Sequence, residues 1–448
     1  MKKYLLSAEA DALAKSRAAG EAEPPGTSSD AHSKASLVRP SGAARTLTQI
    51  KNFRYVQIDA IGVGLAIAAS PFLPVFLTRL GASNFQVGLL TSMPALAGLL
   101  LAIVIGNILQ RQRNIVPWFS GARLMVISAY ALTGLVPFLV PREWAIPAVL
   151  LIWALVTLPQ TVVTVCFSVV MNAVAGPQGR YDLMSRRWSI LGATSAITVA
   201  LVGQFLDRVS FPINYQAVFM GLSLGGLISF YFSSHIQIPD NPPQPRKDGQ
   251  SLKQRIKSYI DLIRSQPAFI SFSAKRFVFI SGQTLAAPLF PLYYVREVQA
   301  TDAWIGIITT VQTAVVLIGY YLWTRQSKLR GSRYVLLRTT LGLSIYPALI
   351  ASTHRVELIA LIAGLAGILQ AGIELVFFDE LMKTVPIEYS ALFVSLAQSL
   401  QNFSGVIAPL IGTLLADQIG IGGAMLVSAA IRLLGFGLFA RGRIGAGN

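Results

Sequence analysis

The chain has 448 residues, of which 53% are hydrophobic and 13% are charged, about half the charged share of a soluble globular domain. That is too little charge to coat a soluble enzyme, and the formal charge of +17 does not make the chain a nucleic-acid-binding protein. The single cysteine, Cys166, excludes a disulfide framework and metal sites built from cysteines. Apolar stretches of about 20 residues recur instead, which is typical of a polytopic membrane protein.

The first 47 residues differ from the rest of the chain. They are rich in Ala, Ser, Gly and Pro with scattered charges, and such a segment buries too little apolar area to offset its chain entropy. Only three apolar residues follow Lys2 and Lys3 before polar residues return, so a signal peptide is not predicted. We predict a disordered cytoplasmic tail over residues 1–47.

Twelve apolar stretches follow this tail. A helix needs roughly 20 apolar residues to cross a hydrocarbon core of about 30 Å, and its backbone amides must pair within the segment. We therefore predict an all-α membrane protein with two six-helix bundles, residues 48–235 and 267–440, and a short cytoplasmic tail over 441–448. The predicted spans are 54–78, 85–109, 118–140, 145–173, 187–206, 212–234, 268–294, 303–324, 335–353, 357–382, 391–416 and 421–440.

The longest connection lies between the two bundles, at residues 236–266. It begins with a Pro-rich stretch and continues with Leu252, Ile256 and Ile260 at four-residue spacing. This spacing places apolar side chains on one face of a helix, with Lys and Arg on the rest of its surface. We predict a cytoplasmic linker whose amphipathic helix lies on the membrane surface.

Lysine and arginine residues are distributed unequally between the two sides of the membrane. When residues within a few positions of a predicted span end are counted with the adjoining loop, 29 of them lie on the side of the chain termini, five lie on the opposite side and three lie deeper within spans. Because cytoplasmic loops carry the excess of positive charge, we predict a multi-pass protein of the plasma (inner) membrane with both termini in the cytoplasm. The same charges would attract the anionic lipids of that leaflet.

The two predicted bundles repeat each other in sequence. At an offset of 217 residues a PxxP pattern recurs, and Arg79 aligns with Arg296. After one inserted residue, ASNFQVGLLT at 82–91 aligns with ATDAWIGIIT at 300–309. Internal duplication about an axis normal to the membrane is the sequence mark of many transporters, whose binding site lies between the halves.

Twelve spans in two sets of six, a long central loop and a Gly–basic loop after spans 2 and 8 resemble the major facilitator superfamily over about residues 50–440. The resemblance implies a transporter whose cavity is lined by spans 1, 4, 7 and 10. In that family an acid of the loop motif helps to latch the cytoplasmic gate, but Gln110 and Lys328 stand in its place here. The residues that match the motif positions are Gly106, Gln110, Arg111, Arg113, Lys328, Gly331 and Arg333.

Three ionisable residues, Asp59, Arg276 and Glu374, lie in the cytoplasmic half of spans 1, 7 and 10. Charge at membrane depth is costly, so such residues are functional candidates. Asp59 and Arg276 occupy the same position of the repeat with opposite charge. We expect the three groups to converge in a wet cavity and to pair and separate as a gate closes and opens. Two alternatives stay open: Asp59 and Arg276 extend to interfacial water, or Glu374 pairs statically with Arg276 for packing.

Glu374 is the candidate for proton coupling, because a carboxyl group in a low-dielectric cavity holds its proton more tightly than in water and a nearby cation loosens it. Polar side chains also recur at three- to four-residue spacing on spans 1, 4, 7 and 10, as on one face of each helix. Polar side chains can join helices without touching a substrate, which is the alternative for each of them. The candidate cavity residues are Ser70, Gln160, Thr164, Ser168, Asn172, Gln283 and Gln370.

We therefore predict a secondary active transporter that moves a small organic solute, anionic or amphipathic, by alternating access coupled to protons. No nucleotide-binding loop is found, so a gradient must drive transport, and no enzymatic group, cofactor or metal site is predicted. We expect a monomer in the lipid bilayer. Two alternatives stay open: a transporter-like protein that does not transport and serves as an assembly, pigment-handling or sensing partner, and a lipid flippase.

Overall fold

The computed structural model describes residues 47–109, 112–238, 262–385 and 390–442, and these residues form helices joined by short connections. The predicted tails lie almost wholly outside the described residues, as does most of the predicted amphipathic helix at 252–263.

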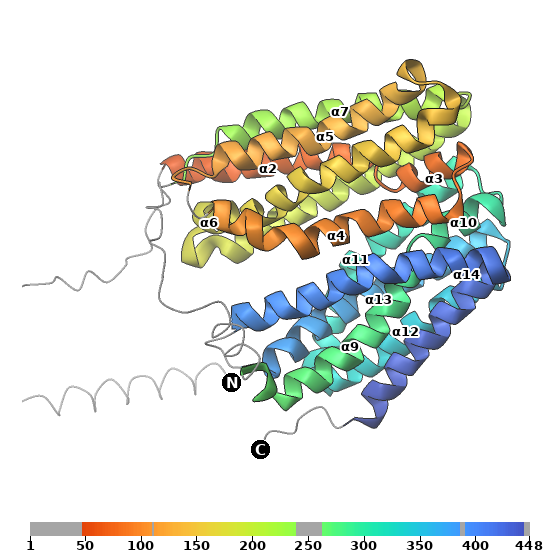
Figure 1. The fold of residues 1–448 in the computed structure, drawn as a ribbon. Helices are drawn as coiled ribbons and strands as arrows, with labels where there is room; N and C mark the ends of the chain where they lie inside the picture. The colour runs from red at the N-terminus through yellow and green to blue at the C-terminus, as the bar shows by residue number, and fades with distance from the viewer. Residues whose placement is uncertain (1–46, 110–111, 239–261, 386–389, 443–448) are drawn as a thin grey trace, which may run out of the picture. The chain divides into compact units, whose positions relative to one another are not determined.

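The first half of the chain contains six spans. α2 and α3 together make span 1, whereas the long helix α6 contains spans 4 and 5. Within α6, Gly176 has backbone angles far from helical values (φ 65°, ψ 177°), so the chain breaks there between the two spans. The helices are α2 (Leu47–Ile67), α3 (Phe72–Arg79), α4 (Asn84–Leu109), α5 (Val116–Leu139), α6 (Arg142–Arg208) and α7 (Ile213–Ser234) (Figure 1).

The second half also contains six spans, but here the long helix joins the last two of them. α9 and α10 together make span 7, and the long helix α14 contains spans 11 and 12, with a break at Gly420 (φ 81°, ψ 160°). The helices are α9 (Pro267–Ala286), α10 (Leu289–Arg296), α11 (Asp302–Arg330), α12 (Ser332–Ala351), α13 (Val356–Lys383) and α14 (Ser390–Arg441).

The predicted all-α fold of twelve spans is confirmed. Eleven helical stretches of the described chain are long and apolar enough to cross a membrane. The last of them, Phe393–Arg441, is 49 residues long and contains the break at Gly420. At about 1.5 Å per residue a single helix of that length would be more than twice as long as a bilayer core is thick, so this stretch makes two spans.

Spans 1 and 7 are each broken near one end by a proline. Pro71 precedes the eight-residue helix α3, and Pro288 precedes the eight-residue helix α10. Proline has no backbone N–H and its ring collides with the carbonyl group of the preceding turn, which explains why the helix is interrupted at each of these positions. α3 and α10 contact each other at the same end of the molecule (Figure 1), and we refer to it as the α3–α10 end.

Besides the contact of α3 with α10, the two halves touch along the longer helix pairs α4 with α14 and α6 with α11. Glycines of both helices meet in the α6–α11 contact. A Cβ atom on Gly203 would lie 2.8 Å from the backbone oxygen of Asp302 and 3.2 Å from the Cα atom of Gly306. Small residues let helix backbones approach closely in membranes, where lipid supplies little hydrophobic driving force. This contact therefore joins the halves close to the α3–α10 end.

Candidate functional site

A cavity of about 470 Å³, which we call the second-half cavity, lies between α9, α13 and α14. Its polar lining residues are Arg276, Gln283, Thr284, Gln370, Glu374, Gln398 and Gln401, and its apolar lining includes Ile280, Phe377 and Phe378. Gln283 donates a hydrogen bond from Nε2 to Oε1 of Gln370 (3.2 Å). The structure thus brings together four of the residues that the sequence predicts for a site, namely Arg276, Gln283, Gln370 and Glu374.

Arg276 is held in this cavity by neutral groups. Its Nη2 donates to Oε1 of Gln401 (2.9 Å), and its guanidinium carbon lies 5.6 Å from the centre of the Phe377 ring, a cation–π contact. Its Nε atom is buried and has no hydrogen-bond partner among the described residues. The guanidinium group therefore keeps both charge and donor capacity for a ligand.

Glu374 is also held by neutral groups. Its Oε2 accepts a hydrogen bond from the Tyr320 hydroxyl (2.5 Å), and its Oε1 accepts from Nε2 of Gln370 (2.9 Å). The side chain is exposed rather than packed. Within the described part of the chain, neither Glu374 nor Arg276 has an ion-pair partner within 4.0 Å, so the static pairing of the two is not observed.

A second cavity, of about 1020 Å³, lies where α6 of the first half meets α11 and α13 of the second, and we call it the seam cavity. Gln370, Glu374 and Phe378 line both the seam cavity and the second-half cavity. Most of the remaining lining is apolar and includes Trp188 and Leu317. The Glu374 carboxylate therefore lies at the junction of a polar cavity and a largely apolar one.

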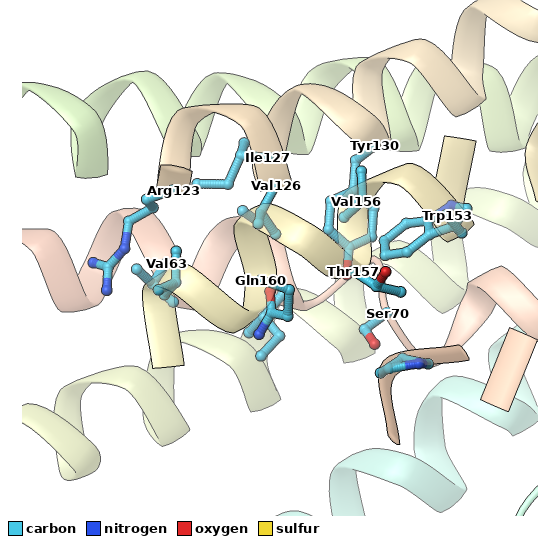
Figure 2. A pocket seen from close by; sticks show the side chains of 14 residues that line it. Val63, Ser70, Arg123, Val126, Ile127, Tyr130, Trp153, Val156, Thr157 and Gln160 are labelled. Atoms are coloured by element: carbon cyan, nitrogen blue, oxygen red, sulfur yellow. The ribbon is translucent and has the colours of Figure 1, made fainter. Parts of the chain in front are cut away.

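The first half has a smaller cavity, of about 300 Å³, between α2, α4, α5 and α6. Figure 2 shows Arg123 at one end of it, with Ser70 and Trp153 toward the other end. Gln160 lies between them and also lines the cavity. Ser70 and Gln160, which the sequence predicts as cavity residues, thus line this first-half cavity rather than the one that holds Arg276 and Glu374.

The prediction that Asp59 converges with Arg276 and Glu374 is wrong, as is its alternative of an interfacial Asp59. Asp59 is fully buried within the first half. Its Oδ1 accepts hydrogen bonds from Nη1 of Arg123 and from the Ser229 hydroxyl (2.6 Å), and its Oδ2 lies 3.7 Å from Nη2 of Arg187. The physical reason is that two buried cations from α5 and α6 neutralise it locally.

Arg123 and Arg187 are the residues that the sequence pattern missed. Both fall near predicted span ends and count there as cytoplasmic loop charges, yet both lie inside helices and are buried. Each guanidinium group also lies over aromatic rings, Arg123 over Phe119 at 4.3 Å and Arg187 over Phe167 at 4.6 Å. The signal in the sequence was Asp59 itself, an acid within span 1. A buried carboxylate requires a cation nearby, so a basic residue on a neighbouring span could have been sought.

Three predicted cavity residues of span 4 lie outside the three cavities above. Thr164, Ser168 and Asn172 are exposed. The Thr164 hydroxyl donates to the backbone oxygen of Gln160 (2.9 Å) and that of Ser168 to the backbone oxygen of Val165 (3.1 Å), the local bonds that such residues often make in helices. Contact of these three residues with a substrate stays a prediction.

The loop motif after span 8 forms a turn with a neighbouring ionic cluster. Gly331 has a positive φ of 82° between α11 and α12. The next residue, Ser332, donates to Oε1 of Glu380 (2.5 Å), and Lys383 donates to the Ser332 hydroxyl (2.7 Å) and to Asp379 (2.6 Å). Gln110 and Arg111 of the first copy lie outside the described residues, Gly106 has open space around it, and Arg113, Lys328 and Arg333 are exposed.

At the α3–α10 end, Arg79 of α3 forms hydrogen bonds with the start of α11 in the other half. Its Nε and Nη2 atoms donate to Oδ1 of Asp302 (3.0 and 2.7 Å), and Nη2 also donates to the backbone oxygen of Ala300 (3.2 Å). The Tyr215 hydroxyl of α7 donates to the same Asp302 oxygen (2.7 Å). We call this set of contacts the first clasp.

The second clasp is the same arrangement with the halves exchanged. Nη1 of Arg296, at the end of α10, donates to Oδ1 of Asn84 in the first turn of α4 (2.6 Å), and Nη2 donates to the backbone oxygen of Ala82. Nδ2 of Asn84 in turn donates to Oδ1 of Asp417 (2.7 Å) in α14. Every partner in this clasp except Asp417 aligns in the sequence repeat with a partner in the first clasp, so the two are related by the internal duplication.

The sequence of the second half matches a known family. Residues 276–444 match the family model described as Major Facilitator Superfamily. Two curated relatives are called Multidrug resistance protein MdtG. The protein of Proteus mirabilis is 25% identical over 161 residues, which cover 35% of this chain and 40% of the relative. The protein of Serratia proteamaculans is 28% identical over 182 residues, which cover 38% of this chain and 44% of the relative. The matched stretch thus spans less than half of either relative.

Solved structures match over nearly the whole described chain. A bacterial homologue of the iron transporter ferroportin in an inward-facing state has a TM-score of 0.66 at 17% identity, covering 89% of this chain and 99% of its own. The nucleoside transporter NupG has a TM-score of 0.65 at 11% identity (88% and 98%), and the xylose transporter XylE from E. coli in an inward-open conformation has 0.62 at 11% (88% and 95%). These likenesses show a shared fold of two six-helix bundles.

Proposed function

We propose that this multi-pass membrane protein is a secondary active transporter of the major facilitator superfamily that moves a small amphipathic organic solute; the family match over residues 276–444 and the shared transporter fold support this. The observation that carries the proposal is the second-half cavity, in which Arg276 and Glu374 lie at membrane depth without ion-pair partners among the described residues. Charged groups at this depth are costly and usually mark a transport pathway. The two MdtG relatives carry the name of multidrug resistance proteins, which favours an amphipathic solute.

The two clasps support alternating access. They tie the halves together at the α3–α10 end through side chains that each half supplies to the other. With both termini in the cytoplasm, as the charge distribution favours, the α3–α10 end faces outward and the clasps close the outer side. This arrangement agrees with the inward-facing states named for two of the similar structures. In the proposed cycle the clasps break and the halves rock to open the outer side.

Glu374 is the proposed site of proton coupling. It lies nine residues before Lys383 at the end of α13, or about 14 Å along the helix, and it lines both cavities. Its two hydrogen-bond donors are neutral, so the group can accept a proton without breaking an ion pair. Movement of one half against the other would change the seam cavity that Glu374 lines, and with it the exposure of the carboxyl group to either side.

The test measures proton flux in proteoliposomes loaded with pyranine. Three probe solutes share a benzene ring and carry fixed charges, so that they do not transport protons by themselves: benzyltrimethylammonium, benzenesulfonate and the zwitterion 3-(benzyldimethylammonio)propanesulfonate. A gradient of at least one probe should drive proton flux with the wild-type protein. Glu374→Gln should abolish the flux, whereas Glu357→Gln, an exposed acid at the other end of the same helix, should retain it.

Each contrary result has a definite meaning. Unchanged flux in Glu374→Gln would remove Glu374 from the coupling mechanism. Movement of a probe without protons would leave a transporter but contradict proton coupling. If none of the three probes moves above the rate in protein-free liposomes, the transport proposal itself is contradicted.

A further inference from the structure

We propose that the solute is a zwitterion: its oxyanion binds Arg276, its ammonium group binds Glu374, and its apolar part lies in the seam cavity. This inference rests on the proposed function only in taking the second-half cavity as the solute site. It adds a chemical class, which the fold and the relatives do not specify.

The first argument is the contrast between this cavity and the buried acids of the described residues, which are all paired with a cation. Asp59 is neutralised by two arginines, and Asp302 is paired with Arg79 at 2.7 Å. Arg276 and Glu374 line one cavity of about 470 Å³, yet each is held by neutral side chains. Two opposite charges kept apart at membrane depth are both left without compensation, which is unfavourable unless a ligand provides it.

The second argument is charge balance. An anion would neutralise Arg276 and leave Glu374 uncompensated, and a cation would do the reverse. A zwitterion pairs with both groups and brings no net charge into the low-dielectric interior, where an unpaired charge is most costly. The oxyanion would also find the buried Nε–H of Arg276, which lacks a hydrogen-bond acceptor among the described residues. Charge-assisted hydrogen bonds of this kind are the strong ones.

The third argument is the surrounding lining. Four glutamines, Gln283, Gln370, Gln398 and Gln401, line the second-half cavity. Each carboxamide can donate and accept hydrogen bonds, so together they suit the polar groups between the two charges of a solute. The glutamines do not favour a positive or a negative group of the solute, so Arg276 and Glu374 select the charges that bind.

The apolar part of the solute is placed by the seam cavity. That cavity, of about 1020 Å³, adjoins the second-half cavity at Gln370, Glu374 and Phe378. Beyond this junction its lining includes the apolar side chains of Trp188 and Leu317. An apolar substituent attached near the ammonium group would therefore leave the polar cavity at Glu374 and bury its surface there, worth about 25 cal/mol per Å².

Such a zwitterion could come from the aqueous phase or from the membrane, and the binding experiment separates these sources. The full chain is placed in nanodiscs of phosphatidylglycerol, which contain no zwitterionic lipid. Dissociation constants are measured for an aqueous set, phenylalanine with phenethylamine and 3-phenylpropionate, and for a lipid set, lysophosphatidylethanolamine with the singly charged lysophosphatidylglycerol of the same acyl chain. In at least one set the zwitterion should bind at least tenfold more tightly than every singly charged analogue of that set, and that set identifies the source.

Variants assign the preference to the two side chains. Arg276→Gln should bring the zwitterion and the cation of the aqueous set to within about threefold of each other, and Arg276→Lys should restore the preference. Glu374→Gln should do the same for the zwitterion and the anion, with Glu374→Asp as its conservative partner. Because each comparison is a ratio within one variant, a general loss of stability does not imitate the result.

The proposal is overturned if neither zwitterion binds more tightly than its singly charged analogues, or if the preference survives unchanged in Arg276→Gln and Glu374→Gln. The outcome is separable from the transport assay, because binding in nanodiscs does not require solute movement. Selective binding of a zwitterion without any flux would contradict the transport proposal alone. Proton flux driven by a probe of one charge, together with absent zwitterion preference, would contradict this proposal alone.

Discussion

Asp59→Asn is the substitution that most directly tests the buried cluster of the first half. The native cluster has one carboxylate between two guanidinium groups, and Asp59, Arg123 and Arg187 are exposed by 0%, 5% and 3%. The amide would keep the shape of the side chain and remove its charge. Arg123 and Arg187 would then be two like charges in the protein interior with no counter-ion among the contacts described here.

The expected cost follows from that change. Removing one partner of a buried ion pair destabilises proteins by about 3–5 kcal/mol, because it leaves an uncompensated buried charge. The double variant Asp59→Asn with Arg123→Met returns the cluster to the native excess of one positive charge. It should therefore be at least about 1 kcal/mol more stable than the sum of the two single effects predicts, the coupling expected of groups in direct contact.

The measurement is equilibrium unfolding in mixed micelles of dodecyl maltoside and increasing SDS, followed by tryptophan fluorescence. Asp207→Asn is the control, since Asp207 is an exposed acid in α6, and it should stay within about 0.5 kcal/mol of wild type. The reasoning is refuted if Asp59→Asn behaves like this control, or if the double variant shows simple additivity.

Two further predictions concern packing and the clasps. Gly226→Ala should destabilise the protein by about 1–3 kcal/mol, because the added methyl group would lie 1.9 Å from a side-chain carbon of α5. Gly221→Ala on the same helix is the control, since its methyl group meets nothing within 4 Å. Equal melting temperatures of the two variants would contradict this prediction. Replacing both Arg79 and Arg296 by Gln should loosen the α3–α10 end, because both clasps lose their charged donor. The probe is a cysteine in place of Ser70, which lines the first-half cavity. In the double variant this cysteine should react several-fold faster with a membrane-impermeant maleimide added outside whole cells than it does with the clasps intact. An unchanged rate would argue against the clasps as the outer closure.

The helices could be predicted from the sequence because the bilayer sets their length and requires their apolar character. The hydropathy of the sequence was less informative about where long helices break. Gly176 and Gly420 interrupt α6 and α14 within what are otherwise continuous runs of helix, so a connection predicted as a loop is a single residue with non-helical angles. The interruptions at Pro71 and Pro288 have a cause that is local to the residue, because proline lacks the backbone N–H that continues a helix.

The site was predictable only in part, because charge pairing is a property of three dimensions. Arg276 and Glu374 share a cavity as the sequence predicts, but Asp59 does not join them, since α5 and α6 bring Arg123 and Arg187 to it. A hydropathy window assigns an arginine near a span end to the loop, although the same residue can turn inward to a buried acid.

The clasps were partly visible in the sequence. The repeat aligns Arg79 with Arg296, and Asn84 occupies the same position as Asp302. What the alignment could not show is that each arginine reaches the opposite half rather than its own.

That crossing over has a consequence for the origin of the protein. Each copy of the duplicated unit supplies an arginine to the other copy and binds the arginine of that copy. Such a contact is self-complementary, as in an interface between two identical subunits. A single six-helix ancestor would therefore already have possessed everything needed to shut one side of the membrane by meeting a second copy of itself. Within one chain the two copies of the contact can differ, as Asp302 opposite Arg79 and Asn84 opposite Arg296 do.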